Sequence, residues 1–311
     1  MSKKNISTNN ALVSISEAIV DVAENLSPSV VCIRSETGGN GSGVIWNADG
    51  FIITCYHIVK RLSEVEVALS DGTSLSAKVV GTDPYSDIAL LKMNTVSNLK
   101  PIDVSDSQNL KAGQFVLAMA NPYGDHPSIT GGIITSIRNS VRGWWGRMMD
   151  DIVITDVRLN PGYSGGPLVN AEGKMVGVNT AYISSRGIAI RSNRVKSIAD
   201  RLAEGGTIKR AYMGVVLNTI TIPKEVATQQ LGTAQDGGLM ILSVENDTPA
   251  KRAGLLIGDV IVKFDKEPVA SMHDLYRQLT QASIGNPVDL SILRGEKLTK
   301  LTLTPSEADN D

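Results

Sequence analysis

The first two thirds of this sequence consist of short apolar segments separated by turn-forming residues, and this pattern restricts the fold more than any other feature. It predicts strands joined by tight turns, and it lacks the strand–helix alternation of a parallel sheet. Hairpin turns are expected at 47–50 and 71–72. About a dozen strands are enough for two small barrels, so the expected fold is mainly β. The predicted strands are 30–33, 43–46, 51–54, 65–69, 77–80, 88–91, 115–118, 133–137, 152–155, 168–169, 176–179 and 187–190.

Composition and charge narrow the classes of function. The chain has 29 glycines and only 4% aromatic residues, which suits strands and tight turns better than a helical bundle. Its 311 residues and 42% hydrophobic content predict about two domains with buried cores. With 30 basic and 32 acidic side chains, the formal charge of −2 provides no net field that would attract nucleic acid or an anionic membrane.

The cysteines and the first residues bear on metals and on the compartment. Cys32 and Cys55 are too few for a disulfide framework, and they lack the His/Cys clustering of a zinc site, so we expect two buried free thiols and no metal. Lys3 and Lys4 precede no apolar segment, and no run approaches about 18 apolar residues. As written, the chain is expected to be soluble and cytoplasmic, although an extracytoplasmic protein trimmed of its leader has the same pattern.

The order of elements divides the chain in two. A helix is expected at 14–26, where Ser14 and Glu17 are spaced as a capping box, and another at 193–203 with Asn193 as its N-cap. After residue 210 the pattern changes, and a further capping box joins Ser271 to Asp274. The second part is expected to contain strands at 238–244, 259–264 and 287–293. The predicted divisions are a disordered N-terminus at 1–13, a β domain at 14–210, an α+β domain at 211–305 and a flexible tail at 306–311.

The segment 160–168 carries the most specific motif in the chain. Its pattern Gly-x-Ser-Gly-Gly-Pro arises by chance roughly once in a few thousand sequences of this length. A nucleophilic Ser164 on a glycine-flanked turn exposes its hydroxyl, and the backbone N–H groups of Gly162 and Ser164 can point at one spot as an oxyanion hole. For the motif taken alone, an ordinary glycine turn with a solvated serine is the alternative.

A serine hydroxyl needs a base to remove its proton, and the chain has three histidines. His57 follows the apolar segment 51–56, where a rigid scaffold can present an imidazole. His126 lies in a polar loop and His273 in the second domain, and solvated positions are expected for both. His57 is therefore the candidate base.

A Ser-His-Asp triad also requires a carboxylate that fixes the tautomer of the histidine. Asp87 precedes the apolar run 88–91, which can bury it. Asp83 is the rival, but it lies beside Pro84 and is expected to form a turn. The chain order of histidine, aspartate and serine is that of the chymotrypsin-like proteases.

Three segments together resemble the catalytic motifs of the HtrA/Deg family of proteases: Thr54-Cys55-Tyr56-His57, the run 83–91 and the run 162–168. The resemblance spans about residues 14 to 305. It implies a chymotrypsin-like double β-barrel followed by a small α+β PDZ domain. It also implies an ATP-independent serine endopeptidase that acts on unfolded or misfolded proteins in protein quality control. The sequence contains no phosphate-binding loop, so no cofactor is expected.

Two positions depart from the family pattern. Cys55 and Tyr56 replace small polar residues before His57, and Tyr163 replaces the usual asparagine before Ser164. Neither change removes a catalytic atom, but both affect loop geometry, since Tyr163 lies between the two expected N–H donors.

The resemblance also implies a specificity pocket, formed by the residues before the oxyanion turn and by the strand opposite. Leu159 and Ile188 indicate a small apolar pocket. Arg158 is unexpected there, and two interpretations remain open. Its guanidinium either recognises an acidic substrate side chain or faces solvent, with Asp156 as a neighbouring partner. The expected pocket residues are Arg158, Leu159, Ile188, Ala189 and Ile190.

The second domain resembles a bacterial PDZ domain. The resemblance implies that a C-terminal peptide binds as an added strand and that the loop 212–215 holds its carboxylate, although the domain could be a spacer. The residues of this loop are Tyr212, Met213, Gly214 and Val215. Family members are commonly trimers, so a homotrimer is expected. Large apolar residues at 143–149 predict either a subunit contact or packing on their own domain.

Two other classes of function remain possible: a chaperone-like binder with a silent triad and a scaffold acting through its PDZ domain. A silent relative would normally lack serine, histidine or aspartate, and here all three positions are filled. A scaffold would not need the turn at 162–167. The sequence therefore favours the endopeptidase.

Overall fold

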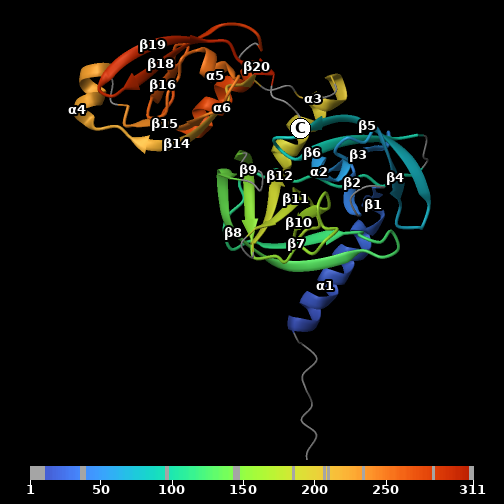
Figure 1. The fold of residues 1–311 in the computed structure, drawn as a ribbon. Coiled ribbons are helices and arrows are strands. Elements are labelled where there is room, and N and C mark those ends of the chain that lie inside the picture. The colour runs from blue at the N-terminus through green and yellow to red at the C-terminus, as the bar shows by residue number, and fades with distance from the viewer. Residues whose placement is uncertain are drawn as a thin grey trace, which may run out of the picture. The chain divides into compact units, whose positions relative to one another are not determined.

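The computed structural model describes residues 11–35, 40–94, 98–142, 148–183, 186–205, 208, 211–232, 235–281 and 284–307. The chain forms two compact units, Met1–Ile208 and Lys209–Asp311, and each is described by itself (Figure 1). Strands predominate in the chain, and this confirms the prediction of a mainly β fold.

Six antiparallel strands of the first unit close into a barrel in the order β1-β2-β3-β6-β5-β4. The predicted hairpin turns are present, because Gly50 N–H donates to the Asn47 carbonyl and Gly72 N–H to the Leu69 carbonyl. Branched aliphatic side chains fill this barrel, among them Ile33. The strands are β1 (Val30–Arg34), β2 (Gly41–Ile45), β3 (Phe51–Thr54), β4 (Glu64–Ala68), β5 (Ser74–Asp83) and β6 (Ile88–Met93).

A second antiparallel barrel follows in the order β10-β11-β12-β9-β8-β7. All twelve strands predicted for the first domain are therefore present, most of them a few residues longer than expected, because ladder hydrogen bonds extend the pairing beyond each apolar run. The strands are β7 (Phe115–Ala120), β8 (Ser128–Arg142), β9 (Met148–Thr155), β10 (Pro167–Asn170), β11 (Met175–Ile183) and β12 (Arg186–Arg191).

The two long helices of this unit begin earlier than predicted. Helix α1 is Ala11–Leu26, so Ser14 is an interior residue and not a cap, and residues 11–13 are helical where disorder was expected. Helix α3 is Ser192–Gly205, so Asn193 is not its N-cap. The Asn193 side chain instead accepts from Ser107 N–H at 3.0 Å and donates to Asp106 at 2.8 Å, which ties α3 to the loop before β7. No helix among the described residues is long and apolar enough to span a membrane.

The second unit contains a six-stranded sheet in the order β14-β15-β16-β18-β19, in which β17 also pairs with β16, with short helices beside it. The predicted capping box forms, because Ser271 N–H donates to Asp274 Oδ2 at 2.9 Å and Asp274 N–H donates to Ser271 Oγ at 3.3 Å. The elements are β13 (Ala211–Tyr212), β14 (Val215–Thr221), α4 (Lys224–Val226), η2 (Ala227–Leu231), β15 (Gly237–Val244), α5 (Pro249–Arg252), β16 (Val260–Phe264), β17 (Glu267–Pro268), α6 (Met272–Gln281), β18 (Val288–Arg294), β19 (Lys297–Leu303) and β20 (Ser306–Glu307).

The predicted flexible tail is partly ordered. Ser306 and Glu307 form β20, which pairs with Tyr212 and Ala211 of β13. The sequence shows no apolar alternation at 306–307, so only the pairing partner makes this segment a strand. Residues 308–311 lie outside the described part of the chain.

Candidate active site

His57 and Asp87 meet at one end of the first barrel. His57 lies in α2 (Tyr56–Val59), directly after β3, and Asp87 precedes β6, which pairs with β3. The Nδ1 atom of His57 is 2.7 Å from Asp87 Oδ2, and the backbone N–H of His57 donates to Oδ1 at 2.9 Å. The carboxylate is 5% exposed and the imidazole 30% exposed, so the aspartate is enclosed while the ring reaches solvent.

The backbone of Asp87 has a left-handed conformation, with φ of 53°. Aspartate tolerates this conformation better than most residues, and here it turns the carboxylate back toward α2. Asp83 has a different position: its carboxylate accepts Tyr85 N–H at 3.2 Å across the turn at Pro84, as expected of a turn former.

Ser164 lies on the turn between β9 and β10. Gly162 has φ of 91°, and Tyr163 N–H donates to the Asn160 carbonyl at 3.1 Å, which closes the turn. The Ser164 hydroxyl donates to the Thr180 carbonyl at 3.1 Å. The Thr180 hydroxyl in turn donates to Asp87 Oδ2, so this residue of β11 links the serine to the aspartate. Thr180 is not predicted from the sequence as a site residue, because it belongs to no recognisable catalytic motif.

The side chain of Tyr163 is directed into the core of the second barrel. It is 3% exposed and packs with buried residues that include Val116, Ala118 and Leu168. Burial raises the pKa of its phenol, and hydrogen bonding to Thr130 and Ser128 opposes this shift. Its bulk is therefore absorbed by the core beside the turn.

Both cysteines are free and buried, which confirms the prediction. The Cys55 thiol donates to the Asn179 carbonyl at 3.3 Å, and its pKa is raised well above the usual value, first by burial and then by the negative charge of Asp87. Cys55, His57 and Asp87 each have a ligand-type atom within 4.8 Å of the others. Because the thiol stays protonated and His57 Nδ1 faces the carboxylate, this group fits a hydrogen-bonded pair better than a metal site.

Gly165 fills the contact between the two barrels and cannot carry a side chain. Its φ is 84°, and an added Cβ would lie 2.0 Å from the Ser42 carbonyl oxygen and 2.5 Å from Thr54 Oγ1. Its N–H donates to the Asn179 carbonyl at 2.8 Å. The serine turn is therefore clamped between β2 and β11.

We expect Gly165→Ala to lower the free energy of unfolding by about 3 kcal/mol, because backbone strain and overlap add at this site. Gly173→Ala is the control, since it has φ of 76° but its nearest neighbour, Val22, is 3.7 Å away. The control is expected to cost only about 1 kcal/mol. Urea unfolding of both variants checks the difference, and equal losses would contradict the role of the clamp.

The residues expected to line the specificity pocket occupy different environments. Ile188, Ala189 and Ile190 of β12 are buried, and Leu159 is half-buried beside Gly187. Arg158 is exposed, and its carbonyl accepts the Thr130 hydroxyl at 2.9 Å. No salt bridge to Arg158 is found among the described residues. Asp156 accepts Ile133 N–H at 2.7 Å, and the exposure of Arg158 favours its solvent-facing interpretation.

The loop 212–215 of the second unit packs on the turn before α5. The Met213 carbonyl accepts Ala250 N–H at 2.8 Å, and the Gly214 carbonyl accepts Glu245 N–H at 3.0 Å. Gly214 has φ of 83°, and an added Cβ would lie 2.2 Å from the Cβ of Thr248. Val215 begins β14, which is the edge strand of its sheet among the described strands, so the loop leads directly into that edge strand.

Solvated positions are predicted for the other two histidines. His126 is exposed, and its N–H donates to the Asp125 carboxylate at 2.7 Å. His273 lies in α6 of the second unit. For the apolar loop 143–149, an activation or subunit-contact role and packing on its own domain both remain open, and its residues 143–147 lie outside the described residues.

Two six-stranded barrels with these residues at their junction define a trypsin-like serine protease unit, and a second unit follows it. The family model described as a trypsin-like peptidase domain matches residues 41–178, and the model described as a PDZ domain matches residues 212–304. The chain belongs to the HtrA family of serine proteases, as the following relatives show.

Putative serine protease HhoA of Synechocystis sp. is 34% identical over 88% of this chain and 72% of its own length. Periplasmic serine endoprotease DegP of Escherichia coli is 35% identical over 85% of this chain and 56% of its own length. The chain thus spans little more than half of the DegP sequence. Among solved structures, HtrA-type protease AlgW with decapeptide is 27% identical with a TM-score of 0.74, covering 94% of this chain and 99% of that one. The serine endoprotease from Yersinia pestis is 28% identical with a TM-score of 0.70, covering 95% and 98%.

Proposed function

We propose that this protein is an ATP-independent serine endopeptidase that hydrolyses peptide bonds in unfolded or misfolded proteins. One observation carries the proposal: His57 Nδ1 lies 2.7 Å from the buried Asp87 carboxylate, and Thr180 connects that carboxylate to Ser164. An enclosed aspartate against a partly exposed imidazole is the arrangement that a general base requires.

Each residue has a role in the proposed acyl transfer. The Asp87 carboxylate holds the His57 proton on Nδ1, so Nε2 carries no proton and can accept that of the Ser164 hydroxyl. Ser164 Oγ attacks the peptide carbonyl, and protonated His57 then delivers the proton to the leaving amine. The N–H groups of Gly162 and Ser164 stabilise the negative oxygen of the tetrahedral intermediate. Water hydrolyses the acyl-enzyme by the same steps with His57 again as base.

The Ser164 hydroxyl has one proton, which is engaged in the hydrogen bond of 3.1 Å to the Thr180 carbonyl. A bond from the same hydroxyl to His57 Nε2 requires that this proton be redirected. Rotation of the Ser164 hydroxyl about the Cβ–Oγ bond therefore precedes attack, and we propose that substrate binding drives it.

Labelling with a fluorophosphonate probe tests the proposal. We expect the probe to form one covalent adduct, located at Ser164 by peptide mapping, and to stop the hydrolysis of a casein-like unfolded protein in proportion to labelling. Hydrolysis should proceed without ATP. If the protein neither labels nor cleaves, even with a hydrophobic C-terminal peptide added, a catalytically silent binder becomes the better description.

We propose a small apolar side chain for the residue before the cleaved bond. The support is the buried, aliphatic strand 188–190 beside half-buried Leu159. The exposed position of Arg158 gives no support to recognition of an acidic side chain.

We propose that the second unit binds the C-terminus of a peptide. The edge strand β14 can accept a further strand, and the loop 212–215 at its start would hold the carboxylate. Isothermal titration of the full chain should show at least tenfold weaker binding for a C-terminally amidated peptide than for the same peptide with a free carboxylate, because amidation removes the charge. Equal affinities would exclude a carboxylate loop.

We propose a homotrimer as the assembled form. Large apolar side chains of α1 remain exposed, with Leu12 at 73% and Ile15 at 54%, and a neighbouring subunit would cover them. Sedimentation equilibrium gives the stoichiometry directly.

A further inference from the structure

Ser42 places all of its polar atoms at the barrel junction. It comes from β2 of the first barrel and is fully buried. Its hydroxyl donates to the Gly162 carbonyl at 2.7 Å and accepts Asn121 N–H at 2.9 Å. Its backbone N–H donates to the Ser164 carbonyl at 2.9 Å, and its carbonyl accepts the Thr54 hydroxyl at 2.7 Å. One residue of the first barrel therefore holds two carbonyls of the serine turn.

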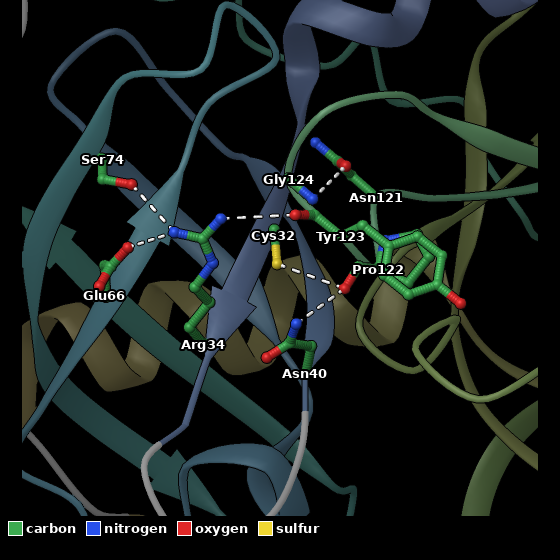
Figure 2. Close-up of polar contacts among 9 residues, drawn as sticks. All are labelled: Cys32, Arg34, Asn40, Glu66, Ser74, Asn121, Pro122, Tyr123 and Gly124. Carbon is green, nitrogen blue, oxygen red and sulfur yellow. Dashed lines mark hydrogen bonds and ion pairs between the residues drawn. The ribbon is translucent and has the colours of Figure 1, made fainter.

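The loop 121–124, which Ser42 also contacts, is held by side chains of β1 and its surroundings (Figure 2). The Pro122 carbonyl accepts Asn40 Nδ2 at 3.0 Å and faces the Cys32 thiol at 3.7 Å. Arg34 Nη2 donates to the Tyr123 carbonyl at 3.4 Å. Figure 2 shows these donors converging on the loop from one side, so the loop is fixed to the first barrel.

Pro122 packs directly against the serine turn at Gly162. A Cβ added to Gly162 would lie 2.4 Å from Pro122 Cβ, so the glycine sits directly against the proline ring. Glycine has the freest backbone of all residues, and a peptide group beside it rotates readily unless neighbouring atoms hold it. In this protein the Ser42 hydroxyl holds the Gly162 carbonyl and Pro122 limits the space beside it.

We propose that Ser42 is a positioning residue for the oxyanion hole. The two proposed N–H donors belong to Gly162 and Ser164, and the carbonyls of these same two residues are the ones that Ser42 binds. Because each peptide group is planar, fixing the Gly162 carbonyl also fixes Tyr163 N–H, which closes the turn on Asn160. The inference rests on the proposed function, since it concerns the donors that would stabilise the tetrahedral intermediate.

The test compares Ser42→Ala with Ser192→Ala. Ser192 is also fully buried, and its hydroxyl donates to the Ser105 carbonyl at the same 2.7 Å, away from the serine turn. We expect both variants to lose similar thermal stability. Only Ser42→Ala should lower kcat, by about 30-fold per titrated active site and with KM changed less than about twofold, because a full oxyanion donor contributes roughly 100-fold or more. Affinity for a peptide boronate should fall in parallel with kcat.

An unchanged kcat for Ser42→Ala, or an equal loss in Ser192→Ala, overturns the inference. If Ser42→Ala does not fold, Ser42→Cys replaces it, since its somewhat larger thiol leaves no cavity and is a weaker donor; an unchanged kcat in that variant has the same meaning. If wild type itself neither hydrolyses casein nor labels at Ser164, the proposed function has failed and the inference fails with it. If wild type is active and Ser42→Ala has an unchanged kcat, only the inference about Ser42 fails and the proposed function stands.

Discussion

Replacing Ser164 with alanine is expected to lower kcat by roughly a millionfold, so that hydrolysis of a casein-like protein falls below detection. The change removes the atom that forms the acyl-enzyme, and no neighbouring group replaces it, because the adjacent Thr180 hydroxyl is already engaged with Asp87. The fold should be little affected. Among the described residues, Ser164 Oγ makes one hydrogen bond, of 3.1 Å to the Thr180 carbonyl, whereas the turn itself is held by backbone contacts.

The measurement is casein hydrolysis together with fluorophosphonate labelling and thermal unfolding. Ser136→Ala is a suitable control, since it removes a serine hydroxyl from β8 without touching the site. The control should retain wild-type hydrolysis and labelling. Residual activity above a thousandth of wild type in Ser164→Ala, after contaminating proteases are excluded, would show that another residue is the nucleophile.

Asp87→Asn is expected to lower kcat about ten-thousandfold while leaving the fold intact. Asparagine is close in shape and tolerates the left-handed backbone at this position, where φ is 53°. Its amide would present N–H to His57 Nδ1, so the ring would carry its proton on Nε2 and could no longer accept one from Ser164. The loss should appear in kcat rather than in KM, because the substrate does not contact the buried carboxylate.

Asp83→Asn provides the matched control, since Asp83 is also buried and its carboxylate accepts Tyr85 N–H at 3.2 Å. Asparagine can keep that bond, so kcat should stay within a few-fold of wild type. Steady-state kinetics on a peptide substrate, with active-site titration, separates the two variants. Equal losses of kcat in the two variants would show that the loss comes from removing negative charge in this region and not from a changed tautomer of His57.

The fold of the first unit follows from its sequence because each strand carries its own local signal. Short apolar runs such as 51–54 and 88–91 are ended by turn residues, and most neighbours in the two barrels are consecutive strands. Pairings such as β3 with β6 and β1 with β4 join distant segments and carry no local signal. The sequence predicts fewer of the strands of the second unit. β19 (Lys297–Leu303) alternates threonine and lysine with leucine and was not recognised, and β14 was partly interpreted as a loop.

The helix ends were misjudged for a related reason. Ser14 and Glu17 have the spacing of a capping box, but Ala11 to Val13 favour a helix as well, so α1 starts one turn earlier. Asn193 has the chemistry of an N-cap, yet its side chain is used by Ser107 and Asp106. Local propensity decided the first case, and contacts that arise only on folding decided the second.

In the candidate site, too, some residues can be predicted from local sequence and others depend on contacts formed on folding. Ser164 and His57 lie in recognisable motifs, and Asp87 could be chosen over Asp83 from its position before an apolar strand. Thr180 and Ser42 could not be found, because their relation to the site depends on β11 and β2 meeting the serine turn in space. Residues that come together only where two barrels meet have no characteristic spacing along the sequence.

Strand β14 has a further consequence for handling the protein. Among the described strands it pairs only with β15, so the other edge of Val215–Thr221 presents unpaired backbone groups next to β-branched side chains. An edge of this kind is a template for self-association, and natural sheets usually shield theirs with lysine, proline or a bulge. A bound peptide would occupy that edge, so the free chain should aggregate at lower concentrations than the peptide-saturated chain does.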